Sequence, residues 1–234
     1  LPISNLHIIE NLVRHADLFL GQANNEIKKS LQPEVLITFG ESVISKNLKL
    51  FLRQYPATIH WHIQTSGTPS DSFQSLTRII HAEPAEFFNL LDSFDTSENF
   101  DQQKRSNYQK LWEVEERKTN RLLQEFYPQE SFGELELVKE ILQQLPLPCN
   151  LHLANSMSVR YANFIGLTAK QKGIEVFSNR GTSGIDGCTS TTVGHALAST
   201  VPNILITGDM AFFYDRNAFW HNYPIANFRA VVLN

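Results

Sequence analysis

The 234-residue sequence contains only two cysteines. Cys149 and Cys188 do not have the spacing of metal ligands, and two cysteines are too few for a disulfide framework in a chain of this length. We therefore interpret both as reduced thiols. No apolar run approaches the roughly 20 residues that a membrane-spanning helix needs, so no membrane span is expected.

Positive charge is not in excess either. Twenty Lys and Arg residues stand against 24 Asp and Glu residues, and the formal net charge of −4 argues against a nucleic-acid partner. The first residues, 1–9, lack the charged start and the small-residue cleavage site of a signal peptide. The composition, with 42% hydrophobic and 19% charged residues, is that of a globular chain with a substantial core. We therefore expect a cytoplasmic protein.

Both ends of the sequence are unusual for a natural protein. The chain begins without Met, and it stops directly after an apolar run at 230–233 that is typical of a buried strand. We therefore expect an excised piece of a longer protein, with a sheet that is truncated at this point.

Short apolar runs alternate with stretches of helical periodicity along the chain. Strands are predicted at 35–39, 58–63, 151–154, 174–177, 204–207 and 230–233. Helices are predicted at 42–54, 84–94, 97–127, 134–145, 160–167, 189–200 and 210–219. This alternation predicts an α/β fold with two Rossmann-like parallel-sheet layers in tandem. A helix end, a Pro and a Gly coincide near 127–132, so we expect domains at 1–128 and 129–234.

The most informative stretch is 178–209, which contains a turn with glycines at positions 181, 184 and 187. Glycine allows positive φ and a close approach of the backbone to a ligand. The helix predicted after this turn begins with Ser and Thr residues, and its first turn offers unpaired N–H groups to an anion. Asp209 follows the predicted strand 204–207, at the end of the strand where open α/β sheets bind ligands. The stretch therefore predicts a phosphate site with a metal ligand beside it.

Two motifs in the second half, NSMSVR from Asn155 and SNRGTSGIDG from Ser178, resemble those of the thiamine diphosphate enzymes. Within that family they are most similar to the menaquinone-pathway synthases that make 2-succinyl-5-enolpyruvyl-6-hydroxy-3-cyclohexene-1-carboxylate. The Gly-Asp pair that ends at Asp209 is followed 25 positions later by Asn234, which is similar to the metal motif of the wider family. The resemblance covers the whole chain loosely and its C-terminal third closely.

This resemblance implies a three-domain enzyme, of which the chain would hold the central domain and the first part of the diphosphate-binding domain. The catalytic glutamate of the family would lie in the missing pyrimidine-binding domain, so no catalytic residue is expected in this chain. The implied reaction is decarboxylation of 2-oxoglutarate on thiamine diphosphate, followed by addition of the carbanion to isochorismate. The implied cofactors are thiamine diphosphate and Mg²⁺ or Mn²⁺, and the implied full-length assembly is a homodimer or homotetramer.

The resemblance also implies roles for individual residues. The implied substrate-binding residues are Ser156, Arg160, Arg180 and Lys46. The implied cofactor-binding residues are Ser183, Gly184, Ile185, Gly208 and Asp209, and Asp209 is also the implied metal ligand. Both substrates carry two carboxylates, and the planar guanidinium group of Arg can bind a carboxylate through two parallel hydrogen bonds. Ile185 matches the aliphatic residue that holds the cofactor bent, which makes its proton transfer intramolecular.

Each of these residue types also has a purely structural explanation. An Arg after a strand is commonly a surface charge, and an Asp at a strand end is commonly a helix N-cap. His60 and His62 share one face of a predicted strand without an evident third metal ligand, so we do not expect a metal there. The aromatic residues within 212–220 are expected to be a helix face that packs on the sheet.

Two other functions stay open. The first is another thiamine diphosphate-dependent 2-oxoacid decarboxylase or synthase, for example one that uses pyruvate. The NSMSVR motif argues against it, because pyruvate has no second carboxylate for an additional Arg to bind. The second is a non-catalytic ligand-binding or oligomerisation module, against which the glycine turn and the Gly-Asp pair argue.

Overall fold

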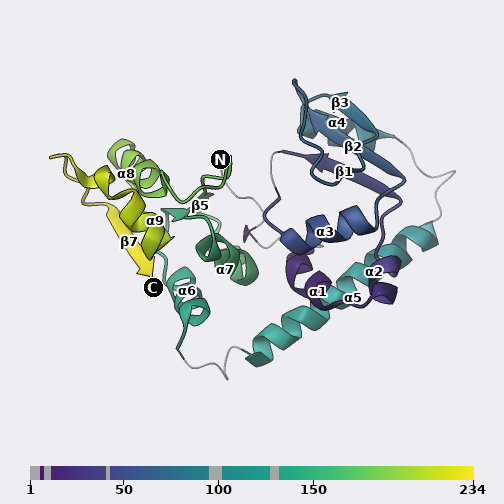
Figure 1. Ribbon diagram of the computed structural model, residues 1–234, viewed down its shortest axis with the longest axis horizontal. Coiled ribbons are helices and arrows are strands. Elements are labelled where there is room, and N and C mark those ends of the chain that lie inside the picture. The colour runs from purple at the N-terminus through teal and green to yellow at the C-terminus, as the bar shows by residue number, and fades with distance from the viewer. Residues whose placement is uncertain (1–5, 8–11, 41–42, 95–101, 127–131) are drawn as a thin grey trace. The chain divides into compact units, whose positions relative to one another are not determined.

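The computed structural model of the chain describes residues 6–7, 12–40, 43–94, 102–126 and 132–234 (Figure 1). Its contacts form two compact units. The N-terminal unit consists of residues 15–123, and the C-terminal unit consists of residues 1–14 together with 124–234. The assignment of 1–128 and 129–234 to two domains of an enzyme stays a prediction.

The N-terminal unit contains a three-stranded parallel sheet in the order β1-β2-β3. The strands are β1 (Val35–Phe39), β2 (Ile59–Gln64) and β3 (Arg78–His81). The helices are α1 (Ala16–Gln22), α2 (Asn25–Ser30), α3 (Lys46–Gln54), α4 (Pro84–Ser93) and α5 (Gln102–Phe126). The sequence did not predict β3, whose four residues include only two apolar ones.

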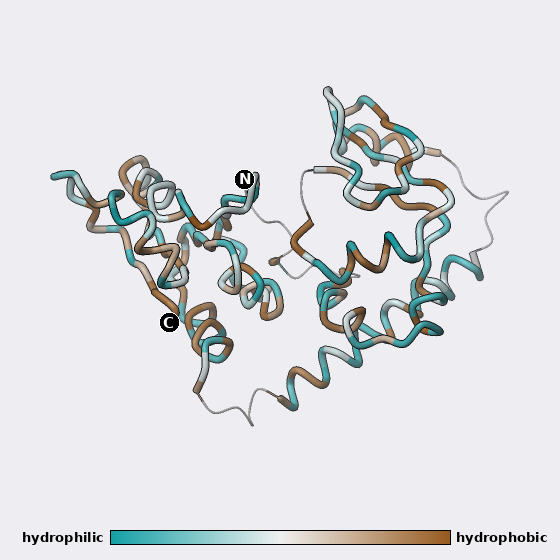
Figure 2. The backbone as a smooth tube through the Cα atoms, in the orientation of Figure 1, coloured by the Kyte–Doolittle hydropathy of each residue, from teal (hydrophilic) through white to brown (hydrophobic). Residues whose placement is uncertain are grey.

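The core of the N-terminal unit includes aromatic contacts between three helices. The ring of Trp112 in α5 makes edge-to-face contacts with Phe19 of α1 at 5.8 Å and with Phe51 of α3 at 6.0 Å. Hydrophobic residues interrupt the largely hydrophilic helix α5 (Figure 2), and they recur three or four positions apart, as at Tyr108, Leu111 and Trp112, so this long helix is amphipathic. Helix α3 begins four residues later than predicted, because the Ser45 hydroxyl caps it by accepting a hydrogen bond from the Leu48 N–H.

The C-terminal unit contains a four-stranded parallel sheet in the order β5-β4-β6-β7. The strands are β4 (Cys149–Leu153), β5 (Ile174–Phe177), β6 (Asn203–Gly208) and β7 (Phe228–Leu233). The helices are α6 (Glu134–Gln143), α7 (Met157–Ile165), α8 (Cys188–Ala198) and α9 (Asp209–Tyr214), with short 3₁₀ helices η3 (Ala169–Gln171) and η4 (Arg216–Phe219). Every strand pair in both sheets is parallel, which confirms the predicted α/β class.

The two central strands of the C-terminal sheet are its most buried part. All of β4 is buried, and β6 is buried up to its last residue, as expected for inner strands covered on both faces. Residues from the start of the chain join this unit, because the Leu6 carbonyl accepts a hydrogen bond of 2.7 Å from the Leu167 N–H. Among the described residues, no helix combines the length and the hydropathy that a membrane span requires.

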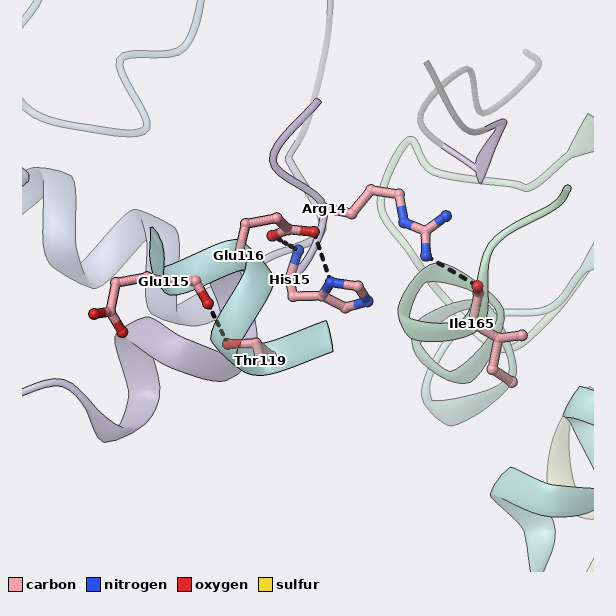
Figure 3. A network of polar contacts seen from close by, with 6 residues as sticks. All are labelled: Arg14, His15, Glu115, Glu116, Thr119 and Ile165. Atoms are coloured by element: carbon pink, nitrogen blue, oxygen red, sulfur yellow. Dashed lines mark hydrogen bonds and ion pairs between the residues drawn. The ribbon is translucent and has the colours of Figure 1, made fainter. Parts of the chain in front are cut away.

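One of the two boundaries between the units falls between Arg14 and His15, each of which is anchored within its own unit (Figure 3). A guanidinium nitrogen of Arg14 donates a 3.0 Å hydrogen bond to the Ile165 carbonyl in the C-terminal unit. The backbone N–H and the ring Nδ1 of His15 contact the Glu116 carboxylate of the N-terminal unit at 2.9 and 2.7 Å. Both sides of the junction are therefore fixed by buried or half-buried polar contacts.

Candidate functional site

The strand order of the C-terminal sheet determines where a ligand can bind. The chain runs from β4 outward to β5 on one side, and then returns to place β6 and β7 on the other side of β4. The carboxyl ends of β4 and β6 therefore flank a topological switch point, the position at which open α/β sheets bind ligands. The NSMSVR segment follows β4, and the Gly208-Asp209 pair lies at the end of β6.

The segment after β4 has an unusual backbone. Ser156 is exposed, has φ of 71° and ψ of −128°, and stands directly before α7 without capping it. Positive φ is rare for residues other than glycine and is concentrated at functional sites. Arg160 lies in the first turns of α7, where its Nη1 donates a 2.6 Å hydrogen bond to the Ser156 carbonyl. The two predicted substrate-binding residues of this segment are thus brought together.

The turn between β5 and α8 differs in detail from the predicted glycine turn. Of its three glycines only Gly187 has positive φ, at 76°, and the other residue with positive φ is Ser183, at 61°. At Gly184 φ is not positive, and an added Cβ would lie 2.5 Å from an oxygen of the Asp186 side chain, which is exposed and free to turn away. Ile185 keeps 37% of its surface exposed, which leaves an apolar side chain available to a ligand.

Asn155 joins the two segments, although the sequence did not single it out. Its Nδ2 donates to the carbonyls of Asn179 and Gly184 at 2.8 and 2.7 Å, and its Oδ1 accepts a 2.8 Å hydrogen bond from Nη1 of Arg180. The side chain is buried, with 4% exposure. Asn155 stood within the NSMSVR motif, but an uncharged amide carries no sequence signal of such a role.

The site is electropositive. Burial lowers the pKa of Arg180 below its usual value, and the neighbouring guanidinium of Arg160 lowers it further. Within the described residues neither guanidinium forms an ion pair, and the buried Nε of Arg180 has no hydrogen-bond partner. Two cations that lie close together without a carboxylate favour the binding of an anion.

Asp209 and Asn234 occupy equivalent places at the ends of neighbouring strands. Gly208 of β6 pairs with Leu233 of β7, so Asp209 and Asn234 are the next residues along two parallel strands about 4.8 Å apart. Both residues can supply oxygen ligands of the kind that Mg²⁺ and Mn²⁺ prefer. Asp209 is half-buried, and its carboxylate has no partner among the described residues.

One backbone donor in the first turn of α8 already has an anionic partner within the chain. The carboxylate of Asp215 accepts a 2.6 Å hydrogen bond from the backbone N–H of Ser190 and a second one from its hydroxyl. Asp215 is buried, with 5% exposure. A carboxylate of the protein itself therefore stabilises this helix start. The hydroxyls of Ser178 and Thr189, which are also buried, have no hydrogen-bond partner in the described structure.

The remaining predicted residues lie in the N-terminal unit. Lys46 is exposed and is the first residue of α3, where the preceding Ser45 has a capping role. Nε2 of His60 and Nδ1 of His62 each contact the Thr38 hydroxyl at 2.9 Å. A hydroxyl that serves two imidazoles explains this His pair without a metal, and the described residues contain no group of three His, Cys, Asp or Glu residues that could hold one.

The prediction that the aromatic residues after Asp209 pack on the sheet is wrong for three of them. Phe213, Tyr214 and Trp220 are 64%, 68% and 80% exposed. Only Phe212 and Phe219 pack inward, with ring centroids 5.8 Å apart. The reason is that Phe212, Phe213 and Tyr214 are consecutive in α9 and therefore point in different directions around the helix, while Trp220 lies beyond the last residue of η4.

Comparisons with known proteins identify the family. A family model described as the middle domain of thiamine pyrophosphate matches residues 4–153. The chain is 41% and 39% identical, each over 99% of its length, to proteins from Cytophaga hutchinsonii and Flavobacterium johnsoniae named 2-succinyl-5-enolpyruvyl-6-hydroxy-3-cyclohexene-1-carboxylate synthase. A Bacteroides fragilis protein of the same name is 37% identical over 95% of the chain. The chain spans 40%, 40% and 38% of the lengths of these three relatives.

Proposed function

The chain belongs to the family of thiamine pyrophosphate-dependent enzymes, and on this premise we propose that the whole protein catalyses the synthesis of 2-succinyl-5-enolpyruvyl-6-hydroxy-3-cyclohexene-1-carboxylate, the reaction for which its curated relatives are named. It would decarboxylate 2-oxoglutarate and add the remaining four-carbon unit to isochorismate in the cytoplasm. The observation that carries this proposal is the pair of guanidinium groups at the switch point of the sheet, Arg160 and Arg180, which have no ion-pair partner among the residues that the structure describes.

The two guanidinium groups suit substrates with two carboxylates. Arg160 and Arg180 repel each other in the described structure, and a bound carboxylate relieves this repulsion. The unpartnered Nε of Arg180 supplies a donor for such a carboxylate, and the exposed Ser156 hydroxyl supplies another. These residues would bind and orient the anionic substrate, while its reacting carbon is held at the cofactor.

The segments around the switch point also fit the proposed cofactor. The backbone of Ser183 and Gly184, together with Gly208 and Asp209, would hold the diphosphate and its Mg²⁺ or Mn²⁺, and Ile185 offers an exposed apolar surface to the rings. Asn234 would add an oxygen ligand beside Asp209. When bound, thiamine diphosphate supplies the electron sink for decarboxylation, and the protein contributes binding and orientation. Lys46 is proposed to bind substrate from the central domain.

The proposal extends to the domain organisation and the assembly of the whole protein. Residues 1–128 would belong to the central domain and 129–234 to the diphosphate-binding domain of a homodimer or homotetramer. A pyruvate-using decarboxylase or synthase is the alternative within the family. The second guanidinium group favours the dicarboxylate substrate, because pyruvate offers only one carboxylate.

The test is a substrate comparison with the full-length protein. Purified protein is supplied with Mg²⁺, thiamine diphosphate and isochorismate, and with either 2-oxoglutarate or pyruvate. We expect carbon dioxide release and the succinyl product, identified by mass spectrometry, only with 2-oxoglutarate. The Asp209→Ala variant serves as the control for metal dependence. Turnover of pyruvate alone would establish the alternative, and binding of cofactor without turnover of either acid would favour a non-catalytic module.

A further inference from the structure

We propose that Asn155 is a positioning residue that holds Arg180 and the β5–α8 turn in one substrate-binding geometry. This inference rests on the proposed function, because it assigns Arg180 to substrate binding. Asn155 lies two residues beyond the end of β4, and its side-chain partners Asn179, Arg180 and Gly184 all follow β5, the neighbouring strand. One buried side chain therefore connects the segments that follow two adjacent strands.

The chemistry of these contacts fits an amide and no other side chain of the same size. Both protons of the Asn155 Nδ2 group are donated to backbone carbonyls, at 2.8 and 2.7 Å. Its Oδ1 is left for the guanidinium of Arg180, at 2.8 Å. The hydrogen-bonding partners thus fix the orientation of the amide and use both of its donors. Asp would place an acceptor against the two carbonyls, and Leu would leave all three groups without a partner.

The neutrality of this partner has a functional consequence. A carboxylate at position 155 would form an ion pair with Arg180 and neutralise the charge that the substrate needs. The amide instead orients the guanidinium through Nη1 while the charge stays uncompensated and Nε stays without a partner. Asn155 would therefore prepare Arg180 for a carboxylate, which lowers the ordering cost of binding.

Asn227 provides a matched control. Its Nδ2 also contacts backbone carbonyls, those of Ala196, Ser199 and Val201, at 2.7 to 3.1 Å. These carbonyls lie at the end of α8 and before β6, at the edge of the sheet opposite to the carboxyl ends of the strands. Replacing Asn227 therefore removes a similar tether without touching the segments that carry Ser156, Arg160 and Arg180.

The experiment uses four variants of the full-length protein: Asn155→Ala, Asn227→Ala, Arg180→Ala and the double variant of Asn155 and Arg180. Calorimetry measures 2-oxoglutarate binding, and hydrogen exchange measures protection of the amides in 180–187 without any ligand. We expect Asn155→Ala to weaken binding about ten- to hundredfold and to speed exchange in the turn, since a charge-assisted contact is lost. Asn227→Ala should lower the melting temperature and leave binding unchanged.

The double variant separates positioning from mere stabilisation. If Asn155 acts through Arg180, Asn155→Ala should weaken binding by less than about twofold once Arg180 is already Ala. Equal effects of Asn155→Ala in both backgrounds would overturn the inference. Should Asn155→Ala not fold, Asn155→Asp keeps the volume, and unchanged binding in that variant would also overturn it. Normal binding by Arg180→Ala itself would instead show that the proposed substrate role of Arg180 is wrong.

Discussion

The carboxylate of Asp215 accepts a 2.6 Å hydrogen bond from the backbone N–H of Ser190, the third residue of α8. Asp215 follows the last residue of α9, the helix that begins at Asp209. The contact therefore connects the start of the helix behind the glycine turn to the end of the helix that carries the proposed metal ligand. A helix dipole and two hydrogen bonds explain why this carboxylate can be buried with no cationic partner among the described residues.

Replacing Asp215 tests this connection. Asp215→Ala should lower the free energy of unfolding by about 1 to 3 kcal/mol, because two donors lose their acceptor. Asp215→Asn retains an acceptor without the charge and should cost about half as much. Urea denaturation of the full-length protein measures both. Asp186→Ala, which removes an exposed carboxylate from the neighbouring turn, should change stability by less than about 0.5 kcal/mol. An equal loss in the Asp186 and Asp215 variants would contradict the connection.

Replacing Arg160 separates substrate binding from cofactor binding. Arg160→Ala should reduce kcat/KM for 2-oxoglutarate by an amount equivalent to about 2 to 4 kcal/mol, since one charge-assisted contact to a carboxylate is lost. The Kd of thiamine diphosphate should change little. Steady-state kinetics and calorimetric titration measure the two quantities separately. Arg216→Ala, an exposed Arg of the same unit, is the matched control, and weakened cofactor binding with unchanged turnover would refute the role of Arg160.

His152 should make stability depend on pH. Burial lowers its pKa from 6.5 to about 4, partly offset by a hydrogen bond with Asn203, while His195 lowers it further. The unfolded chain binds the proton more tightly than the folded chain does. The contribution of His152 to the free energy of unfolding is therefore fully present above pH 6.5 and is lost as the pH falls from 6.5 to 4. Below pH 4 the imidazole is protonated in both states, and the free energy of unfolding no longer depends on this group. The difference corresponds to about 3 kcal/mol.

The measurement is urea unfolding of the full-length protein at several pH values between 7 and 4. His152→Gln should flatten the dependence in this window, because the titrating group is gone. His81→Gln, which removes an exposed imidazole, should leave the slope unchanged. A slope that stays the same in the His152 variant would show that other groups are responsible.

The 234-residue chain by itself should fold without catalysing decarboxylation. It spans 40% of the length of two curated relatives. The motif resemblance implies that the catalytic glutamate belongs to the pyrimidine-binding domain, which we propose lies outside this chain. Incubation with thiamine diphosphate, Mg²⁺ and 2-oxoglutarate should therefore release carbon dioxide no faster than the cofactor alone. Faster release would show that the active site has been misplaced.

The sequence predicted the elements better than it predicted the contacts between them. The strand Val35–Phe39 and the strand Ile174–Phe177 have the predicted bounds, because short segments rich in β-branched and aromatic residues favour strands even at the edge of a sheet, where both of these strands lie. The start of α3 was missed because it depends on the Ser45 cap, which also donates to Asp17 of another helix. Such a tertiary contact is not visible in local periodicity.

In the proposed site, too, the sequence predicted individual residues but not the contacts between distant segments. Motif resemblance identified Arg160, Arg180 and Asp209, whose charges and spacing are visible in the sequence. It did not identify Asn155 or Asp215, since their partners lie 24 to 29 residues away and become neighbours only when β4, β5 and β6 assemble. Of the three glycines of the turn, only Gly187 has the positive φ that the sequence analysis expected of them, because backbone dihedral angles depend on the folded turn and not on composition.

The N-terminal unit is one continuous segment, whereas the C-terminal unit is assembled from both sides of it. During synthesis on the ribosome, Leu6 emerges long before Leu167, whose N–H donates a hydrogen bond to the Leu6 carbonyl in the folded unit. At typical rates of synthesis this interval is roughly 10 to 30 seconds, and domains can fold as units during that time. Residues 15–123 can therefore fold first, at a time when the partner of Leu6 has not yet been synthesised. A chaperone that binds exposed apolar residues could bind Leu6 during this interval.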